Sequence, residues 1–235
     1  MKTAGSIVCA ALALICLAAG PTTQPAYLAP DSFDFKTLLG EPPADGSTVQ
    51  RDEIASMRTL QILRSPEDVE RCNAEVNASA MAFARPVLGE WFSAKNLPET
   101  AALFKEITQQ TSVVSGAAKA TWARKRPNVT DDRLKPCVQL EKTYSYPSGH
   151  ATRGMVWGVI LAEMFPEHRD ALIAAGRRFG TDRTLAGVHY PSDVAAGQKL
   201  GADIARRMLA DPAFAARLEK AKEECLMRQG EKVTR

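Results

Sequence analysis

Apolar residues recur along most of this chain with the spacing of an α-helix. Between residues 49 and 64 they return at every third position, which is the pattern of one buried stripe on a helix. The residues of that stripe are Ile54, Met57, Leu60 and Leu63. Ser65 and Pro66 follow and are typical of the N-cap and first position of another helix. We therefore expect successive helices in this part of the chain.

Later segments continue this helical pattern. Helices are predicted at about 98–126, 150–164, 167–178 and 191–220. Runs in which polar residues alternate with apolar β-branched residues are missing from the sequence. No segment repeats at a fixed period, and 235 residues are enough to build one core. The expected fold class is all-α, a single-domain helical bundle whose helices bury one another's apolar faces.

The N-terminal part departs from this pattern. Residues 1–20 combine an early lysine, an apolar stretch and small residues at its end, which is typical of a secretory signal peptide. Residues 21–48 are rich in proline and glycine and predict a loop-rich arm, packed on the helical domain of residues 49–235. The alternative is a retained N-terminal anchor. No later segment is apolar for long enough to span a bilayer, so we expect a periplasmic or secreted protein without a stable membrane anchor.

The number of cysteines limits the disulfides that the exported protein could form. Cys9 and Cys16 lie in the predicted signal peptide, which leaves Cys72, Cys137 and Cys225. An odd number allows at most one internal disulfide, and the sequence does not show which pair forms it. The three are far apart and show no CxxC spacing, so they do not predict a metal site.

Composition and charge exclude one class of partner. The chain is 45% hydrophobic and 24% charged, as in ordinary soluble proteins, and its net charge is only +3. Aromatic residues make up 6%, and no basic stripe interleaved with aromatic residues appears. We therefore expect no nucleic acid polymer as a partner.

The stretch "YSYPSGHAT" introduces candidate chemistry. Ser148, which follows Pro147 and precedes an apolar helical run, is a natural N-cap. The backbone amides after an N-cap have no intrahelical partner and can hold an anion at the positive end of the helix dipole. Gly149 and His150 lie at this helix start. An ordinary capped helix with an incidental histidine is the alternative interpretation.

A second histidine stands in "HYPSD". His189 and Asp193 are four residues apart, at the start of a helix announced by Pro191, so their side chains can share one face. A carboxylate bonded to one ring nitrogen fixes the tautomer and leaves the other nitrogen unprotonated. His189 is thus a candidate nucleophile or base, although such a pair can also serve only to tie a helix start.

Three cations complete the set of candidate residues. Lys119 and Arg126 are seven apart, two turns along one predicted helix, and should point the same way. Arg183 lies six residues before His189. Arg124 and its neighbour Lys125 are expected to form an ordinary solvated face. Cations, helix-terminal amides and two histidines fit a phosphate group, whose ester hydrolysis needs strong stabilisation of negative charge.

Three stretches carry a resemblance to a known family. "KATWARKRP" (119–127), "PSGH" (147–150) and "DRTLAGVHYPSD" (182–193) resemble, in order and spacing, the signature of the type 2 phosphatidic acid phosphatase superfamily. Within it, the exported bacterial class A non-specific acid phosphatases look most similar. The resemblance covers residues 119–193 and the helix that follows. The family usually has serine before the arginine of the third stretch, where this chain has Asp182.

The resemblance implies an acid phosphatase that hydrolyses small-molecule phosphate monoesters. His189 would attack phosphorus and become a phosphohistidine, Asp193 would orient it, and His150 would protonate the leaving alkoxide and later activate water. The residues that would hold the phosphoryl oxygens are Lys119, Arg126, Ser148, Gly149 and Arg183. No metal or cofactor is implied, the rate should peak on the acid side of neutral, and a homodimer is possible by resemblance.

Several alternatives use similar residues. A phosphatase of lipid phosphates or diphosphates would share the same chemistry. A vanadate-dependent haloperoxidase would hold vanadate at His189, and a non-catalytic module would bind phosphate without turnover. A metallohydrolase would need His150, His189 and Asp193 as ligands, but the sequence lacks a compact HxxxH or HxH pair.

Overall fold

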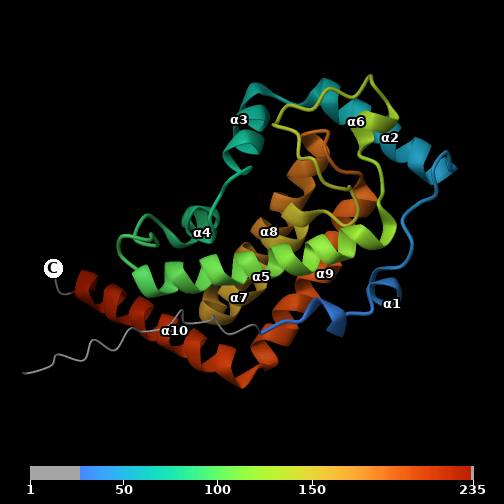
Figure 1. The fold of residues 1–235 in the computed structure, drawn as a ribbon. Helices are drawn as coiled ribbons and strands as arrows, with labels where there is room; N and C mark the ends of the chain where they lie inside the picture. The colour runs from blue at the N-terminus through green and yellow to red at the C-terminus, as the bar shows by residue number, and fades with distance from the viewer. Residues whose placement is uncertain (1–26, 234–235) are drawn as a thin grey trace, which may run out of the picture.

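The computed structural model describes residues 27–233, and these residues fold as an assembly of helices (Figure 1). The predicted signal peptide, with Cys9 and Cys16, and the first residues of the predicted arm lie outside the described residues. In chain order the helices are η1 Pro30–Ser32, α1 Phe35–Leu39, α2 Thr48–Leu63, α3 Pro66–Ala74, α4 Ala80–Leu88, α5 Pro98–Trp122, α6 Pro127–Thr130, α7 Gly149–Met164, η2 Pro166–His168, α8 Arg169–Leu185, α9 Pro191–Ala210 and α10 Pro212–Val233. The described residues contain no β-strand, which confirms the all-α fold class.

Local sequence signals set most of the helix starts. Ser65 caps α3, and Ser65 and Asp68 form a reciprocal capping box. The predicted helix 191–220 is wrong in one respect, because it divides at Asp211 into α9 and α10. Pro212 cannot continue the hydrogen bonding of α9, and the Asp211 side chain accepts from the backbone N–H of Ala213 and Phe214 over 2.8 and 2.9 Å. Asp211 therefore caps the new helix.

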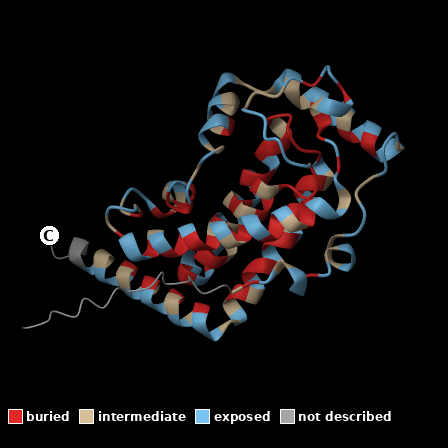
Figure 2. Cartoon of the chain, in the orientation of Figure 1, coloured by how far each residue is buried: buried red, intermediate tan, exposed pale blue. Residues whose placement is uncertain are grey.

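Helix α7 forms the centre of the core. It packs against α5, α8 and α9, and buried residues gather where these helices meet (Figure 2). Glycines allow the close approach of α8 and α9. A Cβ added at Gly176 of α8 would lie 2.6 Å from the carbonyl oxygen of Gly154, and one at Gly201 of α9 would collide with that of Thr152. The backbone of α7 is thus held directly against both neighbours.

The described part of the arm packs on this core. Leu28 and Phe33 are buried in the main apolar cluster, and Tyr27 and Phe35 pack against it in part. The hydroxyl of Tyr146 donates to two backbone carbonyls at the end of α1, those of Leu39 and Gly40, at 3.1 Å each. The arm therefore contacts the segment that leads into α7.

The cysteines in the described residues are not paired. Cys72 is buried and lies with the half-buried Cys137 in a small apolar cluster that includes Val188. Cys225 is buried in the main core, 3.8 Å from the hydroxyl of Thr100. The structure therefore contains none of the disulfides that the sequence allows between these three residues.

Candidate active site

The two histidine motifs meet where α7 and α9 begin. The backbone N–H of Ser148 donates to the backbone carbonyl of Asp193 over 2.9 Å, which ties the start of α7 to the first turn of α9. Close packing makes this possible, because a Cβ added at Gly197 would collide with the carbonyl oxygen of Ser148. The fold thus places residues from two separate motifs side by side.

His189 and Asp193 form a buried pair, as the sequence predicts. His189 is 1% exposed, and its Nδ1 lies 3.4 Å from Oδ2 of Asp193. Because a carboxylate can only accept at that nitrogen, Nδ1 carries the proton and Nε2 keeps the free electron pair. Nε2 lies 3.4 Å from Nη1 of Arg126. His189 precedes α9 and therefore does not share a helical face with Asp193, yet it is placed to act as a nucleophile or a base.

Asp193 has more partners than the sequence indicates. Its Oδ1 accepts from Arg124 over 2.6 Å, and its Oδ2 accepts from Ser145 over 2.5 Å and from the backbone N–H of Tyr190 over 2.9 Å. Arg124 is 5% exposed and also donates to Glu53 over 3.2 Å. The prediction of a solvated Arg124 is therefore wrong, because this side chain is enclosed between two carboxylates.

Lys119 and Arg126 both reach the site, but not for the predicted reason. Helix α5 ends at Trp122, and Ala123 has a left-handed φ of 48°, so Arg126 stands outside α5, directly before α6. Nη1 of Arg126 donates to the carbonyl of Val188 over 3.2 Å. Burial, together with the nearby Arg126, lowers the pKa of Lys119 to about 8. Lys119 is therefore a cation at acid and neutral pH.

The start of α7 has the geometry of an anion site. Oγ of Ser148 accepts from the backbone N–H of Ala151 over 3.3 Å, which is the predicted cap. Gly149 and His150 occupy the first turn, where N–H groups have no intrahelical acceptor. A Cβ added at Gly149 would lie 3.8 Å from Cε of Lys119. The positive end of the α7 dipole and the ammonium group of Lys119 thus both favour an anion at the start of α7.

Each ring nitrogen of His150 faces an oxygen atom of another residue. Nε2 lies 3.1 Å from the carbonyl of Val76 and donates to it, because a carbonyl only accepts. Nδ1 then faces Glu141, whose Oε1 is 3.6 Å away. Burial lowers the pKa of His150 to about 3, and Arg153 and Arg183 add to this effect. His150 lines a small pocket with Val76, Arg126, Val138, Gln139, Glu141, Arg183 and Val188.

Arg183 and its neighbour Asp182, both on α8, form ion pairs with residues at the C-terminal end of α3. Nη2 of Arg183 donates to Glu75 over 2.7 Å, while the preceding residue, Asp182, accepts from Nε of Arg71 over 2.9 Å and from its Nη2 over 3.3 Å. The carboxylate of Asp182 is thus directed to α3 and does not line the pocket. This accounts for an acid at a position where the family has serine.

Sequence reasoning missed three residues around the site: Glu141, Ser145 and Arg153. Ser145 holds Asp193, and Glu141 contacts His150. Arg153 follows His150 by one turn, and its guanidinium lies 5.2 Å from the ring centroid of Trp157. Its Nε and Nη2 have no hydrogen-bond partner among the described residues. The signal that could have found Ser145 and Arg153 was their position, the first inside the stretch that carries Ser148 and His150 and the second directly after it.

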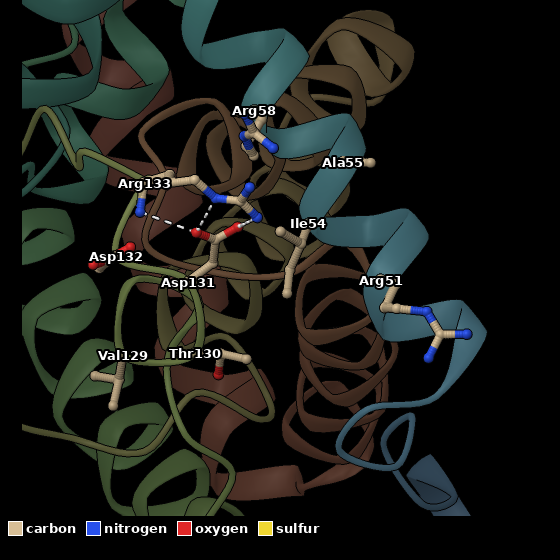
Figure 3. Close-up of a pocket in the computed structure, with 9 residues that line it drawn as sticks. All are labelled: Arg51, Ile54, Ala55, Arg58, Val129, Thr130, Asp131, Asp132 and Arg133. Carbon is tan, nitrogen blue, oxygen red and sulfur yellow. Dashed lines mark hydrogen bonds and ion pairs between the residues drawn. The ribbon is translucent and has the colours of Figure 1, made fainter.

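A second hollow lies between α2 on one side and α6 with the segment that follows it on the other (Figure 3). Its lining residues are Arg51, Ile54, Ala55, Arg58, Val129, Thr130, Asp131, Asp132 and Arg133. Asp131 accepts from Nε and Nη2 of Arg133, each over 2.8 Å, so that cation is already neutralised. No histidine lines this hollow, so it is a weaker candidate for the active site than the pocket around His150.

Two absences concern the described residues only. Within residues 27–233 no three His, Cys, Asp or Glu side chains are grouped so that they could hold a metal ion. None of the helices in that range combines the length and the apolar character needed to cross a membrane.

Comparison with known proteins identifies one family and several relatives with the same named activity. The sequence model of the PAP2 superfamily matches residues 102–214, the region that contains the site. A non-specific acid phosphatase of Salmonella typhimurium is 32% identical over 212 residues, which is 86% of this chain and 84% of that protein. An acid phosphatase of Zymomonas mobilis is 31% identical over 193 residues, 79% of this chain and 73% of that protein.

Solved structures show the same fold. A transmembrane PAP2 type phosphatidylglycerolphosphate phosphatase from Bacillus subtilis superimposes with a TM-score of 0.50 at 18% identity, covering 73% of this chain and 89% of that one. A bacterial vanadium-dependent iodoperoxidase gives a TM-score of 0.51 at 18% identity, covering 71% of this chain and 51% of that one. At such identity these two show the fold alone, whereas the acid phosphatases match over most of the chain at higher identity. This chain belongs to the PAP2 superfamily.

Proposed function

We propose that this chain is an exported acid phosphatase, a phosphoric monoester hydrolase that needs no metal and forms a phosphohistidine at His189. One observation carries the proposal. A buried histidine paired with a carboxylate directs its free nitrogen toward Arg126, and a second histidine lines the pocket that Arg126 also lines. Relatives named non-specific acid phosphatase, matched over most of the chain, support the reaction class.

The first half-reaction transfers the phosphoryl group to the protein. Nε2 of His189 attacks phosphorus, the ester P–O bond breaks, and the leaving alkoxide takes the proton from Nδ1 of His150. Negative charge builds up on the phosphoryl oxygens during this step. Preorganised donors offset that charge without moving, which is the largest contribution expected from such a site. These donors are Lys119, Arg126, Arg183 and the amides at the start of α7, capped by Ser148.

The second half-reaction releases phosphate. His150, now neutral, takes a proton from water, and the oxygen of that water attacks phosphorus. The P–N bond breaks, phosphate leaves, and His189 recovers its free electron pair. Asp193 keeps the imidazole of His189 in the same tautomer through both steps. His150 ends protonated, ready for another ester.

A direct assay tests the proposal. The mature protein should release phosphate from an aryl phosphate monoester in the presence of a chelator. Turnover lost only in chelator would move the chemistry to a metal. A folded protein that binds phosphate without turnover would instead be a binding module.

The pH dependence follows from the buried groups. Burial lowers the pKa of His189 to about 4, so its nucleophilic form persists down to that pH. His150 must be protonated, and burial lowers its pKa to about 3, so kcat/KM should already fall as pH rises above about 3. Burial and Asp182 raise the pKa of Glu75 to about 7, so Glu75 is neutral in acid and leaves the charge of Arg183 to phosphate. We expect an acid optimum; an alkaline one would contradict these roles.

Asp182→Ser should reduce stability and spare substrate binding. Arg71 then loses a carboxylate whose side chain is only 6% exposed, which we expect to cost ~1–2 kcal/mol of the free energy of unfolding in urea. KM should change less than about threefold, because Arg183 lines the pocket and the carboxylate of Asp182 does not. Arg71→Ser is the matched control, and the two losses should not add. A tenfold rise in KM at unchanged stability would instead place Asp182 in phosphate binding.

A lipid phosphate is the second candidate substrate. Lipid A 1-phosphatase of Rhizobium johnstonii is 45% identical over 58 residues, although these are only 25% of this chain. Beside the site, three exposed apolar side chains line a hollow that also contains Lys119 and Arg126. They are Val129, Leu140 and Tyr144. A lower KM for a long-chain alkyl phosphate than for glycerol phosphate would favour this candidate.

A further inference from the structure

The carboxylate of Glu141 lies among the groups assigned to phosphate and to the leaving alkoxide. Its Oε2 accepts from Nη2 of Arg126 over 2.9 Å. Its Oε1 lies 3.6 Å from Nδ1 of His150, the nitrogen that would protonate the alkoxide. Lys119 and His189 also act on this carboxylate electrostatically. A carboxylate of this chain thus makes the contacts that a phosphoryl group would make.

The segment around Glu141 is attached to the protein mainly through these same groups. Residues 139–144 are exposed and belong to no helix. Arg126 donates from Nε to the carbonyl of Thr143 over 2.8 Å, and Lys119 donates to the carbonyl of Tyr144. Within the described part of the chain, the hydrogen bonds and ion pairs that the segment makes beyond itself go to Lys119, Arg126 and His150. A ligand that takes these groups must therefore displace the contacts of the segment.

We propose that Glu141 is an internal competitor for phosphate, a residue that sets how tightly the site holds both substrate and product. The inference rests on the proposed function in taking this pocket as the phosphate site. The inference does not require that the protein hydrolyses the bound ester.

The competition follows from charge. His150, Arg126, His189 and Lys119 overcome the opposing effect of burial and lower the pKa of Glu141 to about 2, so the carboxylate is ionised throughout the working pH range. An ionised carboxylate and a phosphate group cannot share Arg126 without strong repulsion. Phosphate must therefore displace Glu141, and the return of Glu141 helps phosphate to leave.

Titration calorimetry with inorganic phosphate at pH 6 and low salt tests the inference. Glu141→Gln keeps the size of the side chain and removes its charge. It should bind phosphate about tenfold more tightly than the unmodified protein, as expected for the loss of one half-exposed competing ion pair. Asp132→Asn is the matched control. It removes the same charge from an exposed residue of the segment between α6 and α7 that does not line the pocket, and should change affinity less than about twofold.

The outcomes separate the two proposals. Tighter phosphate binding by Glu141→Gln, with or without hydrolysis by the unmodified protein, supports the competitor, while absence of hydrolysis alone defeats only the proposed function. Equal or weaker binding by Glu141→Gln overturns the competitor. Absence of phosphate binding in every folded variant overturns both. Glu141→Ala must give the same direction of change, which excludes an effect of the new amide.

Discussion

His189→Ala is expected to abolish phosphate release from an aryl monoester. The imidazole is the only side chain whose free nitrogen faces Arg126 while a buried carboxylate fixes its tautomer, among the residues that the structure describes. Its loss removes the proposed nucleophile, and kcat should fall by about 10⁴-fold or more. The matched control is His168→Ala, because the side chain of His168 is 45% exposed and does not line the pocket. It should retain full activity.

A trapping experiment distinguishes a nucleophile from a base. His150→Ala keeps the proposed nucleophile but lacks the group that activates water, so it should accumulate phosphoprotein when given an ester with a good leaving group. The phosphate should map to His189 after an alkaline quench, since a P–N bond is labile in acid. A protein that carries both His150→Ala and His189→Ala should remain unlabelled. Label on another residue, or turnover by a folded His189→Ala protein near the unmodified rate, would defeat the assignment.

Local signals made much of this site predictable. Ser148 caps α7 because its hydroxyl reaches an amide three residues ahead, and His189 contacts Asp193 across four residues. Such contacts depend on short stretches of chain, which sequence patterns encode directly. The all-α class followed similarly from helical periodicity. What the sequence could not supply was the mutual placement of the motifs, which depends on glycine packing between α7, α8 and α9.

Two features that the sequence does not reveal are contacts between distant parts of the chain. Arg124 was expected in solvent, but it meets Glu53, 71 positions away. Asp182 meets Arg71 across 111 positions. Neither contact produces a periodic pattern in the sequence, because the partner lies on another helix and the position of that helix depends on the whole fold. Lys125, next to Arg124, is exposed as predicted, which shows that neighbouring cations can differ completely in burial.

Asp193→Asn should impair activity and stability together, and through separable causes. Asp193 is 0% exposed and accepts from Arg124, Ser145 and the backbone N–H of Tyr190. Although burial opposes ionisation, its bond to His189 and the charge of Arg124 lower the pKa of Asp193, so it is an anion at working pH. An amide has the same shape without the charge. Of its two carboxylate partners Arg124 keeps only Glu53, and we expect a loss of ~2–4 kcal/mol in the free energy of unfolding, since breaking a buried pair leaves a charge less well compensated.

The loss of activity has a different origin. If the nitrogen of the new side-chain amide faces the imidazole, Nδ1 of His189 must accept, and the proton moves to Nε2, where the nucleophilic electron pair should be. We expect kcat to fall by about 10³ to 10⁴-fold, as for a histidine held in the wrong tautomer. Ser145→Ala is the control: it removes one donor to Asp193 and should cost ~1 kcal/mol with less than about tenfold loss of kcat. Because stability and kcat fall for different reasons, added phosphate should restore the melting temperature of Asp193→Asn without restoring kcat. An Asp193→Asn protein whose kcat stays within about tenfold of the unmodified rate would show that His189 does not depend on this carboxylate.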